Sequence, residues 1–127
     1  MTIDHNGYIY VTDKGNHKVK KFHKTVRNVV TIAGTGIAGD GDQFNNPHGI
    51  AVDDSGNIFV ADESNNKVKK ISVGSIVSTI AGTGTPGFSD TVGSLAKLNS
   101  PTGLAIDSNG ALILCDTANN RIRKISK

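Results

Sequence analysis

Several residue types are scarce in this chain of 127 residues, and each scarcity excludes a class of protein. There is no tryptophan and a single cysteine, Cys115, which excludes an internal disulfide framework and a zinc site built from several cysteines. No run approaches the roughly 18 consecutive apolar residues of a membrane-spanning helix. The first residues lack the basic and apolar segments of a secretory signal. We therefore expect no association with a membrane, and the compartment stays unknown.

A large excess of charge is absent as well. Fourteen Lys and Arg oppose eleven Asp and Glu, and the resulting net charge of +3 is too small to indicate a dedicated nucleic-acid-binding arm. The abundant residues are β-branched, with 13 Ile and 11 Val against 5 Leu. Because such side chains suit a pleated surface, the composition predicts β-structure rather than a helical bundle.

The chain repeats itself with a period of roughly 50 residues. TIDHNGYIYVTDKGNHKVKKF from Thr2 aligns with AVDDSGNIFVADESNNKVKKI from Ala51 and AIDSNGALILCDTANNRIRKI from Ala105. A second block agrees, because VVTIAGTG from Val29 matches VSTIAGTG from Val77. Turn residues that recur at equivalent places are expected to shape the hairpins, and these are Gly7, Gly56, Gly110, Asp13, Asp62, Asp116, Asn16, Asn65 and Asn119.

Each unit contains short runs with the composition of β-strands. In the second unit we expect strands at residues 49–53, 57–61, 67–71 and 76–81, separated by turns rich in Gly, Asp and Asn. Nothing has helical periodicity except a short turn at residues 94–98. The three units together predict four, four and three strands.

A four-stranded unit of this length is typical of a β-propeller blade. The predicted fold is therefore all-β, a β-propeller segment of just under three blades. The blades are expected at residues 1–36, 49–84 and 103–127, and the third is incomplete. A single blade cannot cover both of its apolar faces, so the blades must stack around an axis.

The segments PHGIAVDDSGNIFVADESNNKVKKIS and PTGLAIDSNGALILCDTANNRIRKIS resemble NHL repeats. The resemblance implies a six-bladed type of propeller, and it implies a non-enzymatic scaffold whose loops bind another protein or a small ligand. Some NHL domains bind RNA, which is an alternative function. A remote third alternative is a zinc-dependent lyase, because Pro47-His48-Gly49 is similar to a zinc-ligand motif of the NHL-like amidating lyase.

The length raises a question about assembly, since a six-bladed ring with this period needs roughly 270 residues or more. Two interpretations stay open. Either the chain is a segment of a longer protein, or two copies join head to tail into one six-bladed ring. In both, each end blade has an apolar face that needs a neighbour.

Basic residues at repeated positions of the third strands are the main candidate binding residues. Stacked blades would arrange them as a band that meets phosphate, or they would pair with the repeated aspartates. Because only four Phe and two Tyr are present for stacking on bases, pairing is favoured over RNA contact. The candidates, with His48 added, are Lys18, Lys20, Lys21, Lys67, Lys69, Lys70, Arg121, Arg123, Lys124 and His48.

The remaining motifs predict no catalytic residue, no metal and no cofactor. Two GxGxxG strings, at residues 34–39 and 82–87, precede no helix and are interpreted as loop glycines. The four histidines map to four different places on the blade, so they do not form a metal site. Asp40 and Asp42 resemble part of a calcium loop, but a solvated loop is preferred. Cys115 is expected to be an inert residue of the second strand.

Overall fold

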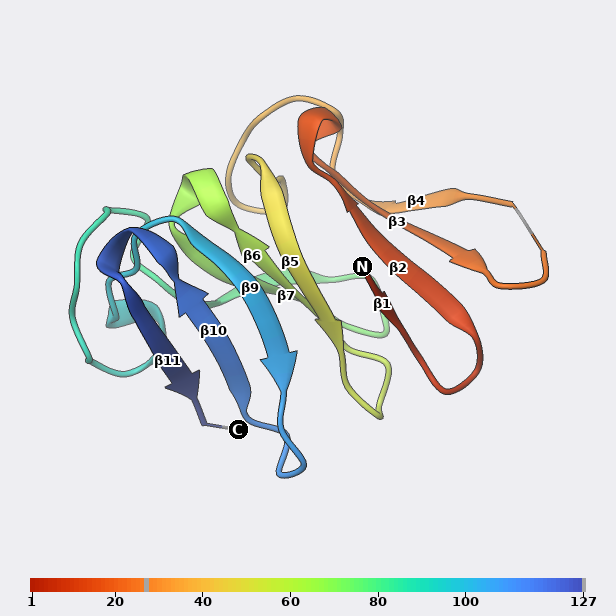
Figure 1. Cartoon of the computed structure of the whole chain (residues 1–127). Coiled ribbons are helices and arrows are strands. Elements are labelled where there is room, and N and C mark those ends of the chain that lie inside the picture. Colours follow the sequence, from red (N-terminus) through yellow and green to blue (C-terminus); the bar gives the residue numbers. More distant parts are fainter. Residues whose placement is uncertain (27, 127) are drawn as a thin grey trace.

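The computed structural model describes residues 1–26 and 28–126, which form three antiparallel sheets and no α-helix (Figure 1). Blade 1 consists of β1 (Thr2–Ile3), β2 (Tyr8–Asp13), β3 (Lys18–His23) and β4 (Val30–Ala33). Blade 2 consists of β5 (Pro47–Val52), β6 (Ile58–Asp62), β7 (Lys67–Ile71) and β8 (Val77–Ala81). Blade 3 consists of β9 (Pro101–Ile106), β10 (Leu112–Asp116) and β11 (Arg121–Ile125). Within the described ranges no helix could span a membrane.

These sheets confirm the predicted all-β fold with four, four and three strands. In blade 2 the third strand has its expected bounds, and the bounds of the other three strands differ from the expectation by one or two residues. β5 begins at Pro47 instead of residue 49, because Pro47 pairs with Asp62 beyond an irregularity in the register. The short helical turn expected at residues 94–98 is a 3-10 turn at Gly93–Leu95.

Two kinds of turn shape every blade. The first and second strands are joined by a tight turn whose glycine has a positive φ, +89° at Gly56 in blade 2. The second and third strands are joined by a 3-10 turn that ends on a left-handed residue, Asn66 in blade 2 and Asn120 in blade 3. Asparagine tolerates this conformation better than most residues, and His17 holds the same place in blade 1.

The blades pack face to face, and the core lies between them. Between blades 1 and 2 the buried residues are Tyr10, Val19, Phe44, Ile50, Ile58, Val60 and Ile71. Between blades 2 and 3 they are Val68, Ala81, Leu98, Leu112 and Leu114. Residues of equivalent sequence position fill both interfaces, so the same packing arrangement occurs twice.

The outer faces of the two end blades carry apolar residues without a neighbour among the described residues. On blade 1, Met1 and Ile3 are exposed. On blade 3, Ile122 is 68% exposed, whereas its repeat equivalent Val68 is fully buried against blade 3. The sequence equivalence therefore predicts which surface would be buried by a further blade.

Two long connectors run between the blades on one edge of the sheets. The first connector comprises residues 34–46 and the second comprises residues 82–100. In Figure 1 the 3-10 turns between the second and third strands lie at the upper edge of the sheets, and the glycine turns lie at the lower edge. The first connector also lies at the upper edge, whereas the second connector, in teal, runs down the left side of the view.

Candidate functional site

A repeated triad of Asp, Asn and a basic residue holds each connector against the blade that follows it, and we call this triad the connector clamp. In blade 2 it comprises Asp62, Asn65 and Lys69. The Asp62 carboxylate accepts a hydrogen bond from the backbone N–H of Asn45 at 2.7 Å and one from the Asn65 amide at 2.7 Å. The same amide donates to the carbonyl oxygen of Gly39 at 2.6 Å. Asp62 and Asn65 together thus tie the 3-10 turn to two parts of the first connector.

Lys69 completes this clamp from inside the molecule. Its ammonium lies 2.8 Å from Asp62, 2.9 Å from Asp40 and 2.6 Å from the carbonyl oxygen of Gln43. The side chains of Lys69 and Asp62 are both 0% exposed. Every buried side-chain nitrogen or oxygen in the described part of the chain has a hydrogen-bond partner, so this buried pair is fully satisfied.

Asp40 is the carboxylate that the first connector brings to the clamp. It also pairs with Lys67. Burial raises the pKa of Asp40, but hydrogen bonds from Lys67 and Lys69 outweigh this effect and hold that pKa at about 2. The residue that resembled part of a calcium loop is therefore engaged by two lysines, while Asp42 is exposed.

Blade 3 repeats the arrangement with a different cation. Asp116 accepts hydrogen bonds from the backbone N–H of Asn99 and from the Asn119 amide, each at 2.7 Å. Arg123 lies 3.1 Å from Asp116 and 2.9 Å from Asp90 of the second connector. The clamp geometry therefore accepts either lysine or arginine at this position.

Blade 1 has the same triad in a different situation. The Asn16 amide donates to Asp13 at 3.0 Å, and Lys20 lies 2.6 Å from Asp13. The side chains of Asp13 and Lys20 are 27% and 30% exposed, and no described connector contacts them. This clamp is formed but holds no loop within the described residues.

The nine basic candidates thus divide into separate environments. Those that pair with a carboxylate are Lys20, Lys67, Lys69, Arg123 and Lys124. Lys21 lies 4.0 Å from the centre of the Tyr8 ring, and Arg121 lies 3.5 Å from the centre of the Phe88 ring. Lys18 and Lys70 are half-buried. The structure does not assemble the nine into one free basic band.

His48 lies on the loop edge, where β5 begins. Its Nδ1 is 3.0 Å from a carboxylate oxygen of Glu63, which also accepts a hydrogen bond from Lys14 of blade 1 at 2.6 Å. Burial raises the pKa of Glu63, but the hydrogen bonds from Lys14 and His48 outweigh it and hold that pKa below its ordinary value. In blade 3 the equivalent pair is Thr102 and Thr117, whose hydroxyls are 2.6 Å apart. The positions of His48 and Glu63 are therefore occupied by different polar pairs in blades 2 and 3, and both pairs link the first strand of the blade to its 3-10 turn.

The histidines lie apart from one another. His17 accepts a hydrogen bond from the backbone N–H of Asn46. His23 contacts Thr25 and the backbone oxygen of Asn6. Residues 1–26 and 28–126 contain no group of three or more His, Cys, Asp or Glu side chains placed to hold a metal ion.

Glycines of the two GxGxxG strings allow the connectors to approach the hairpins closely. A Cβ atom on Gly34 would lie 2.3 Å from the backbone oxygen of His17, and one on Gly82 would lie 2.3 Å from that of Asn66. Both glycines also have φ above +90°. The role of these two glycines is therefore close packing of the connectors against the hairpins.

Cys115 lies on β10, where it is half-buried.

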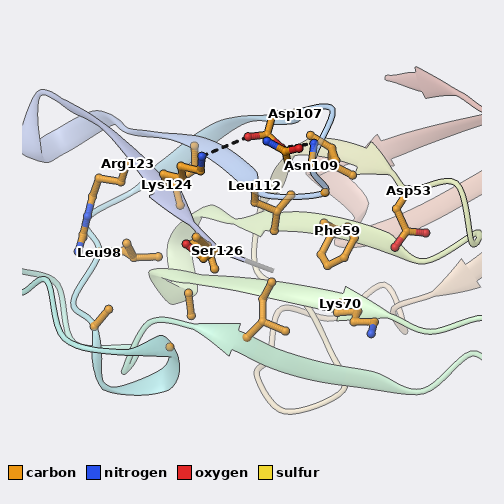
Figure 2. Close-up of a pocket in the computed structure, with 18 of the residues that line it drawn as sticks. Asp53, Phe59, Lys70, Leu98, Asp107, Asn109, Leu112, Arg123, Lys124 and Ser126 are labelled. Carbon is orange, nitrogen blue, oxygen red and sulfur yellow. Dashed lines mark hydrogen bonds and ion pairs between the residues drawn. The ribbon is translucent and has the colours of Figure 1, made fainter.

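A groove of about 1510 Å³ opens between blades 2 and 3 (Figure 2). Its apolar lining includes Phe59, Ile80, Leu98, Leu112 and Ile125. Figure 2 shows the ion pair of Lys124 with Asp107 on one side of the groove and Lys70 on the opposite side. The groove combines an apolar floor with charged groups at its rim, which is the usual composition of a binding site.

Comparison with known proteins identifies the repeats. The family model described as NHL repeat matches residues 44–71 and 98–125. The chain contains two NHL repeats. The matched segments cover β5 to β7 of blade 2 and β9 to β11 of blade 3, together with the ends of both connectors.

The chain spans about a third or less of the length of three similar proteins. It is 41% identical over 120 residues to Protein SUPPRESSOR OF QUENCHING 1, chloroplastic, of Arabidopsis thaliana, a match that covers 94% of this chain and 7% of that protein. An auxiliary nutrient binding protein from Bacteroides thetaiotaomicron has a TM-score of 0.76 at 22% identity, over 93% of this chain and 34% of that one. A streptogramin B lyase structure has a TM-score of 0.72 at 18% identity, over 99% and 36%. These structures support the propeller fold.

Sequence reasoning about the NHL repeats missed two features. It did not find that Asp40 and Asp90 of the connectors join the clamps, because no fixed spacing relates them to Lys69 and Arg123. It also did not find the groove, whose lining comes from both blades and from the second connector.

Proposed function

We propose that this NHL-repeat chain is a non-enzymatic binding scaffold that holds an extended segment of a partner protein in the groove between blades 2 and 3. The observation that carries the proposal is the groove beside β11, which combines an apolar floor with charged groups at its rim. In blades 1 and 2 the third strand is covered by a fourth strand, whereas β11 has no such neighbour among the described residues. An extended segment can satisfy the free backbone groups of an edge strand by adding to the sheet.

The complete blades indicate how such a segment would lie. In blade 2, Val77 of β8 stands opposite Ile71 of β7 and packs against the core between blades 1 and 2. The repeat equivalent of Ile71 is Ile125, which lines the groove. A partner residue opposite Ile125 would therefore point into the groove, where an apolar side chain is favoured.

The rim of the groove offers polar groups that would fix the orientation of the partner. Lys70, Asn109 and the ion pair of Lys124 with Asp107 lie along it. Cations and carboxylates are both present, so a segment of mixed charge fits better than a polyanion. The likeness to a protein named as nutrient binding supports binding as the general class of function.

The test uses a blocked peptide that copies residues 76–82 and measures chemical-shift changes of the isotope-labelled chain. We expect changes along β11 and at Phe59 and Leu112. A peptide with Lys in place of Val77 should lose binding, because that side chain points into the groove. A matched peptide with Lys in place of Ser78, which is exposed on β8, should keep it. Absence of binding, or equal binding of the two variant peptides, would contradict the proposal.

RNA binding through the third strands is the competing proposal. Phe88 with Arg121 stacked on its ring supports it, because base stacking uses such groups. Five of the nine basic candidates are already paired with carboxylates, which leaves fewer charges for phosphate. Binding of single-stranded RNA that weakens steeply with salt would favour this alternative over the peptide groove.

A further inference from the structure

His17 holds the place in blade 1 that Asn66 holds in blade 2. Both residues end a 3-10 turn in the left-handed conformation, with φ 56° at His17 and φ 54° at Asn66. Each side chain accepts a hydrogen bond from the connector that leads to the next blade. The backbone N–H of Asn46 donates to Nδ1 of His17 at 3.0 Å. The backbone N–H of Ser100 donates to Oδ1 of Asn66 at 2.9 Å, so the two blades make the same contact with different acceptors.

The two acceptors respond differently to acid. An amide side chain keeps its charge, whereas an imidazole changes its charge between about pH 5 and pH 8. A neutral histidine accepts a hydrogen bond through one ring nitrogen, and a protonated histidine has a proton on both nitrogens and accepts none. Because Nδ1 of His17 faces an N–H donor, protonation sets two donors against each other. The contact is therefore complete at the alkaline end of this range and is lost as the pH falls through it.

No ion pair compensates for this loss, since His17 forms none with the described residues. The nearby carboxylates of blade 2 are engaged by other cations, Glu63 by Lys14 and His48 and Asp62 by Lys69. The charged and titratable residues of the elements around the contact are Asp13, Lys14, Lys18 and Lys20 of blade 1, Asp40 and Asp42 of the first connector, and His48, Asp62, Glu63, Lys67 and Lys69 of blade 2.

Two other histidines are distinguishable from His17. His48 lies two residues beyond Asn46, but its ring faces Glu63 at 3.0 Å, so protonation strengthens that contact. His23 also accepts a backbone N–H, that of Thr25 at 3.2 Å, but it lies at the opposite end of β3. An acid-induced loss at Asn46 is therefore specific to His17.

The part of the connector that depends on His17 is short. Asp62 holds the backbone N–H of Asn45, and Lys69 holds the carbonyl oxygen of Gln43, whatever the charge of His17. Loss of the His17 contact therefore loosens the connector around Asn46, where the chain enters β5, and leaves the remainder seated.

We propose that His17 makes the end of the first connector sensitive to pH, because the neutral imidazole holds Asn46 and the protonated imidazole releases it. The second connector, held by Asn66, stays seated over the same range. The chain thus has one acid-sensitive and one acid-insensitive connector at equivalent places in the repeat. This inference is independent of the groove of the proposed function.

The test measures hydrogen exchange of backbone amides at about pH 8 and about pH 5.5, corrected for the intrinsic exchange rate at each pH. In the native chain the protection factor of the Asn46 amide should fall by roughly fivefold or more at the lower pH, because its hydrogen bond is lost. The protection factor of the Ser100 amide should stay the same.

Two variants assign the change to a single side chain. His17→Asn installs the residue of blade 2 in a conformation that asparagine tolerates, so this variant should fold and keep the Asn46 amide protected at both pH values. His48→Asn should retain the fall seen in the native chain. The proposal is overturned if the protection of Asn46 is independent of pH, if Ser100 changes equally, if His17→Asn retains the fall, or if His48→Asn abolishes it.

Discussion

Replacing Lys69 by methionine should destabilise the chain far more than the same replacement at Lys20. Methionine retains much of the apolar stem of lysine but removes the ammonium. At Lys69 this leaves the Asp62 carboxylate buried without its cation, with both side chains 0% exposed in the native structure. Removing one partner of a buried pair typically costs about 3–5 kcal/mol. At Lys20, whose pair with Asp13 is partly exposed, the loss should be about 1 kcal/mol or less.

The measurement is urea unfolding of both variants followed by circular dichroism. A loss of about 4 kcal/mol is a large part of the stability of a small domain, so Lys69→Met is expected to unfold at a much lower urea concentration than the native chain. Lys69→Arg serves as the control for the chemistry of the pair, because Arg123 occupies the equivalent position in blade 3. It should keep the native fold. Equal losses at Lys69 and Lys20 would refute the argument that burial of the clamp decides its contribution.

Three further predictions follow from the geometry. Gly82→Ala should lower the free energy of unfolding by about 2 kcal/mol or more, because the residue has φ +97° and a Cβ would lie 2.3 Å from a backbone oxygen. Gly15→Ala, in open space, should change the free energy of unfolding little, and equal effects of the two substitutions in urea unfolding would refute the packing role of Gly82. Asp40 has a pKa of about 2 against an ordinary 3.8, so its stabilising contribution is complete above pH 3.8 and is lost as the pH falls through 2. Asp40→Asn should flatten this acid dependence when the free energy of unfolding is measured against pH, and an unchanged profile would contradict the role of Asp40 in it. Ile122→Asp should reduce any self-association of the chain seen by light scattering, since Ile122 is 68% exposed on the outer face of blade 3. An unchanged mass distribution would exclude that face as the contact between copies.

Much of the fold could be predicted because the sequence contains three copies of one unit that align with one another. Recurrence of Asp13, Asp62 and Asp116 in register indicates three equivalent hairpins from the sequence alone. The strand positions followed from runs of β-branched residues between glycine and asparagine turns. The start of β5 was missed by two residues because Pro47 pairs across an irregular register, which depends on the partner strand.

The candidate site was less predictable from sequence. The nine basic residues share repeated positions, and their spacing is the same for a free surface band as for structural ion pairs. The choice between these depends on what lies opposite each side chain. For Lys69 that is Asp40, which a connector brings to the clamp from a distant part of the chain. The sequence suggested pairing with Asp62 and could not identify this second carboxylate.

The sequence alone therefore determined the number and type of strands, the repeat and the positions of its turns, because these depend on local side-chain preferences and on periodicity. The tertiary structure decided which charged residues are buried. Lys69 and Lys20 have equivalent places in the repeat, but one is enclosed by a connector and the other is partly open to solvent. That difference arises from contacts between segments far apart in the chain, which local side-chain preferences and periodicity do not describe.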